Sequence, residues 1–185
     1  GGDGADAAVF SGELADYDMS GLVFTDGVIS GTITGGTDGT DTLDNVEALK
    51  FADGFHVLPG MSIQAAVDAA QDGDTIYVAA GTYDITETIV IDKSITLVGA
   101  QSGVDPRTAA GLRTAGSEGE SVIQGAGDPP TLDTLIRIAA ADVTIDGFDI
   151  GHGTGDLVES DVAIANPVIR NSFVHDSSGD EGIQL

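Results

Sequence analysis

The sequence predicts a mainly β protein in which a short capping helix leads into the stacked coils of a parallel β-helix. Three observations support this fold class. An apolar stripe at helical spacing begins after Ser62, and short β-branched runs separated by turn residues follow it. Further along, Ile145–Ile150 (IDGFDI) and Ile169–Val174 (IRNSFV) match apolar with apolar at a separation of 24 residues, about one coil.

The composition is strongly acidic and free of cysteine. The 185 residues include 31 Asp and Glu against 6 Lys and Arg, which gives a formal net charge of −25. Such a chain cannot neutralise phosphates, so we exclude nucleic acid and anionic membranes as partners. Lack of cysteine excludes disulfides and thiolate metal sites. No apolar run is long enough to span a bilayer, so we expect no membrane insertion.

The first nine residues, GGDGADAAV, fit the pattern G-G-x-G-x-D-x-U-x, in which glycines allow tight turns and the Asp supplies a carboxylate oxygen. Asp38–Leu43 (DGTDTL) repeats the second half of this pattern. Both resemble the calcium-binding repeats of RTX (haemolysin-type) proteins. Asp38–Gly54 (DGTDTLDNVEALKFADG) resembles the segment that closes such arrays in type I secreted proteins and in alginate epimerases.

The RTX resemblance implies a β-roll remnant that binds calcium, and an extracellular or cell-surface location reached by type I secretion. The predicted calcium ligands are Gly2, Asp3, Gly4, Asp6, Asp38 and Asp41. The alternative is that these aspartates form ordinary Asp-Gly turns. One repeat cannot complete a site, so we expect the array to begin upstream of Gly1.

The remainder of the N-terminal segment predicts antiparallel hairpins. Val9–Asp18 and Leu22–Thr34 alternate apolar and polar stretches, with turns at Asp26-Gly27 and Gly35-Gly36. Asp44 and Asn45 are expected to cap a short turn over residues 46–49. We divide the chain into an RTX-type unit with its hairpins at residues 1–56 and a β-helix at residues 57–185.

The capping helix has an apolar face and both end signals. Ser62 can cap its start and Gly73 follows its end. Its apolar stripe consists of Ile63, Ala66, Val67 and Ala70. The strands expected next are Thr75–Val78, Thr88–Ile91 and Ile95–Val98, with turns at Gly81-Thr82, Asp84 and Asp92-Lys93.

The stretch SIQAAVDAAQDGDTIYVAAGTY resembles the N-terminal cap and first coil of the pectin-lyase-like superfamily. The resemblance covers residues 57–185 and implies a right-handed parallel β-helix. It does not decide activity, because this superfamily includes lyases, hydrolases, epimerases, tailspikes and adhesins.

The pattern of strands is interrupted after Val98 and resumes at Val122. Residues 99–120, rich in Gly, Ala and Ser, are expected to form a loop thrown out from the first coil. Gly147 falls over Asn171 in the 24-residue alignment, and both residue types tolerate the left-handed backbone of a tight bend. The later strands are expected at Val122–Gln124, Leu135–Ile138, Val143–Ile145, Phe148–Ile150, Val168–Arg170, Phe173–Val174 and Ile183–Leu185. The chain stops in a strand, so we expect a truncated or otherwise covered last coil.

Candidate catalytic residues cluster in two stretches, DGFDIGH (146–152) and RNSFVHDSSGD (170–180). The 24-residue alignment places Asp149 near His175. DGFDIGH resembles the YGFDPH motif of alginate epimerases, but it has Asp146 at the aromatic position, Ile150 at the proline, and its His one residue later. The candidates are Asp149, His152, His175 and Asp176. The alternative is that these stretches form coil bends without chemistry.

Two functional hypotheses remain open. The first is a calcium-binding fragment of a secreted bacterial RTX-type surface or matrix protein, whose β-helix serves in adhesion, assembly or polysaccharide binding. The second is a fragment of a secreted calcium-dependent polysaccharide-modifying enzyme of the uronan lyase or C5-epimerase type. The sequence favours the first, because it shows no matched catalytic set. The expected partners are extracellular polysaccharide or other copies of the protein.

Overall fold

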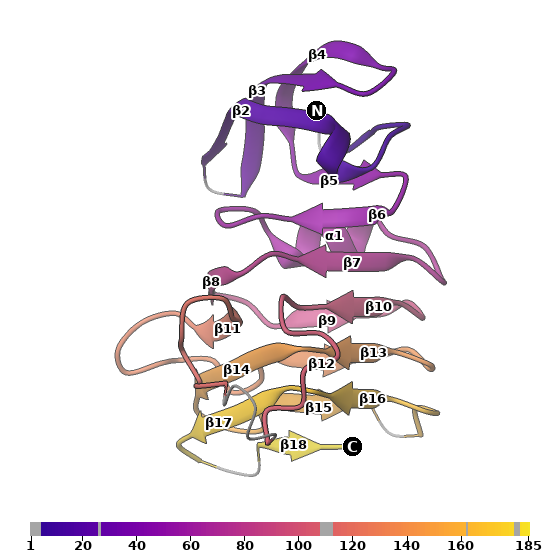
Figure 1. Ribbon diagram of the computed structural model, residues 1–185. Helices are drawn as coiled ribbons and strands as arrows, with labels where there is room; N and C mark the ends of the chain where they lie inside the picture. The colour runs from indigo at the N-terminus through magenta and orange to yellow at the C-terminus, as the bar shows by residue number, and fades with distance from the viewer. Residues whose placement is uncertain (1–4, 26, 108–112, 162, 180–181) are drawn as a thin grey trace.

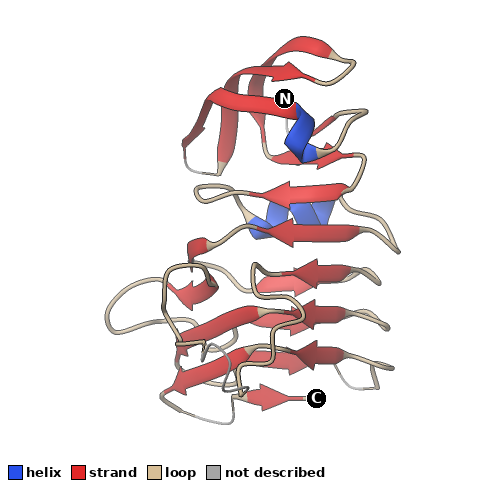
Figure 2. Ribbon diagram, viewed as in Figure 1, coloured by secondary structure: helices blue, strands red, loops and turns tan. Residues whose placement is uncertain are grey.

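The computed structural model describes residues 5–25, 27–107, 113–161, 163–179 and 182–185, and the chain forms an elongated column (Figure 1). Strands dominate it, and the two short helices lie near the N-terminal end (Figure 2). The first elements are β1 (Ala7–Val9), a 3-10 helix η1 (Leu14–Asp16), β2 (Tyr17–Thr25), β3 (Val28–Gly35), β4 (Gly39–Val46), β5 (Ala48–Phe51) and β6 (Gly54–Val57).

The N-terminal strands form two arrangements. β2, β3 and β4 pair antiparallel, as the hairpin prediction requires, with one face buried by Leu22, Ile29, Ile33 and Leu43. β1 pairs parallel with β5, and β5 pairs antiparallel with β6. The expected short turn over residues 46–49 is wrong, because this segment joins two strands. Asn45, near the end of β4, has a left-handed backbone with φ of 54°.

The helix α1 (Ile63–Ala69) confirms the predicted cap. The Ser62 side chain accepts a hydrogen bond from the Ala65 N–H at 3.2 Å, which satisfies one of the free donors of the first turn. Ile63, Ala66 and Val67 are buried, as the apolar stripe predicts. α1 thereby covers the N-terminal end of the coils, where it contacts β6, β7 and β9 (Figure 1).

From Thr75 the chain winds through four coils of three strands each in the described residues. Coil 1 comprises β7 (Thr75–Val78), β8 (Gly81–Ile85) and β9 (Ile89–Ile91). Coil 2 comprises β10 (Thr96–Val98), β11 (Ser121–Gly125) and β12 (Ile136–Ile138). Coil 3 comprises β13 (Thr144–Asp146), β14 (Phe148–Gly153) and β15 (Val158–Ser160). Coil 4 comprises β16 (Val168–Arg170), β17 (Phe173–Ser177) and β18 (Ile183–Gln184).

Equivalent strands of successive coils stack in parallel, which confirms the predicted β-helix. Sheet 1 runs in the order β1-β5-β6-β7-β10-β13-β16, sheet 2 is β8-β11-β14-β17, and sheet 3 is β9-β12-β15-β18. The core is built by rows of apolar side chains in register, because alternate residues of a strand face one side of a sheet. One such row in sheet 1 is Phe55, Ile76, Leu97, Ile145 and Ile169.

The 24-residue alignment is confirmed in register and in backbone conformation. Ile145 pairs with Ile169, and Ile150 pairs with Val174. Gly147 and Asn171 have φ of 86° and 51°, so both occupy the left-handed region at the bend between sheets 1 and 2. Gly147 is also needed for space, because a Cβ there would lie 2.1 Å from the Ser102 nitrogen.

Several boundaries differ from the prediction. β8 occupies the residues expected as turns at Gly81-Thr82 and Asp84, and β15 was not predicted. The long loop leaves coil 2, between β10 and β11, and not coil 1. The predicted division at residue 56 falls inside β6, which pairs with both β5 and β7 in sheet 1.

Candidate functional site

The candidate site lies on the outer face of sheet 2. Tyr83, Ile123 and Ile150 are in register and point into the core. Strand alternation therefore directs the residues on either side of them outward. The outward row that follows them is Asp84, Gln124, Gly151 and His175. Asp84 and Gln124 are joined by a hydrogen bond of 2.6 Å from Gln124 Nε2.

Asp149 and His175 form a close pair across coils 3 and 4, as the sequence alignment predicted. The Nε2 atom of His175 lies 2.6 Å from Asp149 Oδ1, and its Nδ1 atom lies 2.9 Å from Asp176 Oδ2. The Asp149 side chain is 1 % exposed, whereas 36 % of the His175 side chain is exposed. The buried Asp149 carboxylate therefore fixes the orientation of the imidazole, and the other side of the His175 ring faces solvent.

Gly151 provides the space that this pairing needs. It is the residue beside His175 in the outward row, and a Cβ on it would lie 3.0 Å from the Cε1 atom of the imidazole. The ring therefore leans over Gly151 to reach Asp149. Any larger residue at this position would push the imidazole away from the carboxylate.

The ionisation of His175 follows from its two carboxylate partners. Burial acts to lower the pKa of His175, but the hydrogen bonds to Asp149 and Asp176 outweigh burial, so the pKa is raised above its usual value. Each carboxylate accepts a hydrogen bond and a neutral imidazole has only one N–H, so the imidazolium is the form that satisfies both. The two carboxylates thus favour the charged, proton-donating form of His175.

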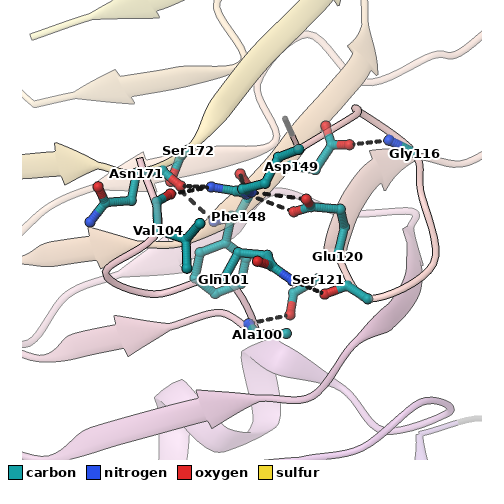
Figure 3. Close-up of polar contacts among 12 residues, drawn as sticks. Ala100, Gln101, Val104, Gly116, Glu120, Ser121, Phe148, Asp149, Asn171 and Ser172 are labelled. Carbon is teal, nitrogen blue, oxygen red and sulfur yellow. Dashed lines mark hydrogen bonds and ion pairs between the residues drawn. The ribbon is translucent and has the colours of Figure 1, made fainter. Parts of the chain in front are cut away.

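The loop between β10 and β11, described at residues 99–107 and 113–120 and called the strap below, covers part of this face. Its Gly116 N–H donates a hydrogen bond to Asp149 Oδ2 (Figure 3). Arg113 fastens the strap: its guanidinium binds both oxygens of Glu120, at 2.9 and 2.6 Å. It also donates to carbonyl oxygens of coils 3 and 4, at Phe148 and Asn171, and to that of Val104 within the strap.

Burial makes the Arg113–Glu120 ion pair structural. The two side chains are 4 % and 2 % exposed, and the Arg113 guanidinium lies 5.0 Å from the centre of the Phe173 ring. Glu120 is held in the strap beside Phe148 and Gly116 (Figure 3). The pair therefore fixes Arg113, whose hydrogen bonds to the Phe148 and Asn171 carbonyls hold the strap against the coils.

Asp146 has a structural role of its own. Ser102 Oγ and Arg170 Nε donate to its Oδ2 atom at 2.7 and 3.1 Å, and Asn171 Nδ2 donates to its Oδ1 atom at 2.7 Å. Burial acts to raise the pKa of Asp146, but these hydrogen bonds outweigh it and lower the pKa. Asp146 thus fixes the bend between sheets 1 and 2.

A cavity of about 400 Å³ opens beside the Asp149–His175 pair. His152, the last residue of the DGFDIGH motif, lines it with its Nε2 atom 2.9 Å from the carbonyl oxygen of Gly127. The partner of Asp149 is therefore His175 of the next coil, and the YGFDPH-like motif does not form a pair of its own. The carboxylates among the described lining residues are Asp84, Asp128, Asp149 and Asp176.

The predicted calcium ligands are only partly described. Gly2, Asp3 and Gly4 lie outside the described residues. The Asp38 carboxylate accepts hydrogen bonds from Ser11 N and Oγ, both at 2.8 Å, and from the Tyr17 hydroxyl. Asp41 lies on β4, and Asp6 directly precedes β1. Within the described residues, no group of three or more His, Cys, Asp or Glu could hold a metal ion, and calcium binding stays a prediction.

Sequence reasoning found Asp149, His175 and Asp176 but missed their surroundings. Asp84 was taken as a turn residue, and Arg113 and Glu120 gave no periodic signal because they lie in a loop. Gly151 could have been found by extending the 24-residue alignment, which places it over His175. Lys93 and Arg137 form ion pairs with Asp92 and Asp161, at 2.8 and 3.7 Å.

Comparison with known proteins places this site in a family. The family model described as rhamnogalacturonase A/epimerase, pectate lyase-like, matches residues 59–183. A search of curated proteins found no match, and neither did a search of solved structures. None of the helices in the described part of the chain is long and apolar enough to cross a membrane. The matched residues contain α1 and nearly all of the four coils, and the chain belongs to the rhamnogalacturonase A/epimerase, pectate lyase-like family.

Proposed function

We propose that this chain modifies an extracellular polysaccharide. In this proposal His175 transfers a proton, and Asp149 orients the His175 imidazole. The observation that carries the proposal is the 2.6 Å contact between a buried carboxylate and a half-buried imidazole beside a cavity of about 400 Å³. A base or acid oriented by a buried carboxylate is a recurrent arrangement for proton transfer. Family membership supports a polysaccharide as the class of substrate.

The exposed side of the imidazole is the reactive one. Asp176 is 77 % exposed, so its side chain can rotate away and leave the Nδ1–H of His175 facing the cavity. That proton can pass to the oxygen of a glycosidic bond as its bond to carbon breaks, while a water molecule adds to that carbon and releases its own proton to solvent. The neutral imidazole that remains keeps its Nε2–H on Asp149.

Turnover assays test this proposal directly. The chain is incubated with neutral, acidic and amino-sugar polysaccharides, and new reducing ends, unsaturated products and inverted sugar units are measured. We expect turnover of one class, lost in His175→Gln and reduced in Asp149→Asn. His56→Gln is the matched control, because His56 lies on β6 in sheet 1. Absence of turnover with every class, or full activity of His175→Gln, would overturn the proposal.

A second candidate is glycan binding without catalysis, as in an adhesion or matrix protein. Both nitrogen atoms of His175 already contact carboxylates, and this closed arrangement favours a fixed binding surface. Under this candidate, glycan binding persists in the absence of turnover, and His175→Gln weakens affinity only.

For the N-terminal unit we propose calcium binding by Asp6, Asp38 and Asp41 together with Gly2, Asp3 and Gly4, in a secreted RTX-type protein. The repeat pattern of the sequence supports it, although Asp38 would have to exchange its contacts with Ser11 and Tyr17 for the ion. Calorimetric titration with calcium chloride tests it, with Asp41→Asn as the variant and Asp161→Asn as the control. Equal heats for all three proteins, or no heat at all, would contradict it.

A further inference from the structure

A second, larger cavity adjoins the candidate site. It measures about 790 Å³ and lies between the start of α1 and the corner that joins β8 to β9. Asp84 lines both this cavity and the one beside His175, so the two cavities adjoin at this residue. Gly27, at the tip of the β2–β3 hairpin, and Met61 form an isolated bridge and also line the larger cavity. The N-terminal unit therefore contributes to this surface.

The charged side chains along the two cavities are predominantly acidic. The described carboxylates that line them are Asp84, Glu87, Asp128, Asp149 and Asp176. The basic side chains among the described lining residues are His152 and His175, and His175 is already matched by two carboxylates. Lys and Arg do not occur among them. The surface therefore repels a polyanion, and the net charge of −25 on the whole chain acts in the same direction.

We propose that the two cavities form one extended groove that takes a linear polysaccharide carrying free amino groups. This inference rests on the proposed function and names the substrate class for the same site. Two adjoining cavities suit a polymer that lies across Asp84 with sugar units in each. Protonated amines of the polymer would donate charge-assisted hydrogen bonds to Asp84 and Glu87.

Oligomers that share one sugar backbone but differ in charge test whether the charge or the shape of the ligand determines binding. Affinities of the full chain are measured for glucosamine oligomers, for N-acetylglucosamine oligomers of equal length and for oligogalacturonate, at a pH where amines are protonated and carboxylates ionised. We expect the glucosamine oligomers to bind about tenfold or more tightly than the acetylated ones, as one charge-assisted hydrogen bond would give. Their affinity should fall as salt is raised.

Oligomer length and substitutions of the lining residues test where the polymer lies. Affinity should rise with oligomer length until both cavities are covered. Asp84→Asn should weaken binding of long oligomers by about tenfold or more, and Glu87→Gln should weaken long oligomers more than short ones. The matched control is Glu159→Gln, because Glu159 lies on β15 in sheet 3 and faces neither cavity.

The results that overturn the inference differ from those that overturn the proposed function. Tighter binding of oligogalacturonate, equal binding of acetylated and free amino oligomers, or an Asp84→Asn variant with unchanged affinity would each overturn the amino-polysaccharide groove. Those results would not contradict proton transfer from His175 to a different glycan. Conversely, salt-sensitive binding of amino oligomers without turnover would support the groove and leave the proposed catalysis contradicted.

Discussion

Gly151 determines where the imidazole of His175 can lie. The two residues pair in register, and the absent side chain of Gly151 is what lets the ring lean back toward Asp149. Because the Cβ contact would be 3.0 Å, tighter than most real contacts, a single methyl group forces the ring to move. The site thus depends on a residue that has no functional group.

Replacing Gly151 tests this dependence. Gly151→Ala should lengthen the contact between His175 and Asp149 and lower the pKa of His175 toward its usual value, because a hydrogen bond that raises the pKa is weakened. NMR titration of the imidazole protons measures the change. Gly73→Ala, after α1, serves as the control for loss of a glycine, because a Cβ there would have open space around it and Gly73 lies away from Asp149 and His175, although its φ of 90° is strained for Ala. An unchanged titration curve for Gly151→Ala would refute the steric argument.

The pH dependence of stability has a definite sign at His175. Its pKa is raised in the folded state, so the folded state binds the proton more strongly than the unfolded chain. The stabilisation is fully present below the unfolded pKa of about 6.5 and is lost as pH rises through the raised folded value. The difference in melting temperature between the native chain and His175→Gln should therefore shrink as pH rises through that window. A difference that stays constant or grows would contradict the pairing with Asp149 and Asp176.

At the scale of elements, the strap is held by one buried cation. Arg113 joins it to coils 3 and 4 through main-chain carbonyls and pairs with Glu120 out of contact with solvent. Taking one member from a buried pair leaves the other charge without compensation, which costs more than the pair itself contributes.

Arg113→Met should therefore destabilise the chain by about 3–5 kcal/mol, as loss of one partner from a buried ion pair does. Urea denaturation measures the free energy of unfolding. The double variant Arg113→Met with Glu120→Leu should recover much of this loss, because it buries no unpaired charge. Equal destabilisation in the single and double variants would show that the hydrogen bonds to the main chain matter more than the charge.

Elements with a periodic pattern could be predicted from the sequence, and the others could not. α1, β7 and β16 were predicted from apolar spacing, and the Gly147–Asn171 bend from two residue types that accept left-handed backbone. β8 was missed because its Gly, Thr and Asp suggest turns, although tertiary pairing with β11 makes it a strand. The strap contacts were beyond prediction, because Arg113 binds carbonyl groups that only the folded coils bring near.

At the scale of the whole molecule, sheet 1 joins the N-terminal strands to the coils. β6 pairs with β5 on one side and with β7 on the other, and Phe55 and Val57 of β6 are buried. The hydrophobic core is continuous from Phe10 to Val158. The family match begins at residue 59, so the continuity of the core extends beyond the matched segment.

Thermal unfolding should accordingly show a single transition for the N-terminal strands and the coils. Shared β pairing and a shared core couple the two parts, so neither can lose its structure alone. Differential scanning calorimetry measures this through the ratio of calorimetric to van't Hoff enthalpy. Two resolved transitions, or a ratio well above one, would instead support independent units divided near residue 56.

The reach of Arg113 also bears on how the protein is made. Its contact with the Asn171 carbonyl spans 58 residues of chain. At translation rates of about 5–20 residues per second, roughly 3–12 seconds separate the emergence of these two residues from the ribosome. During that interval a nascent chain carries the arginine without its most distant anchor, and His175 has not yet emerged. The pair of Asp149 and His175 can therefore form only after coil 4 has emerged, well after the strap and coil 2.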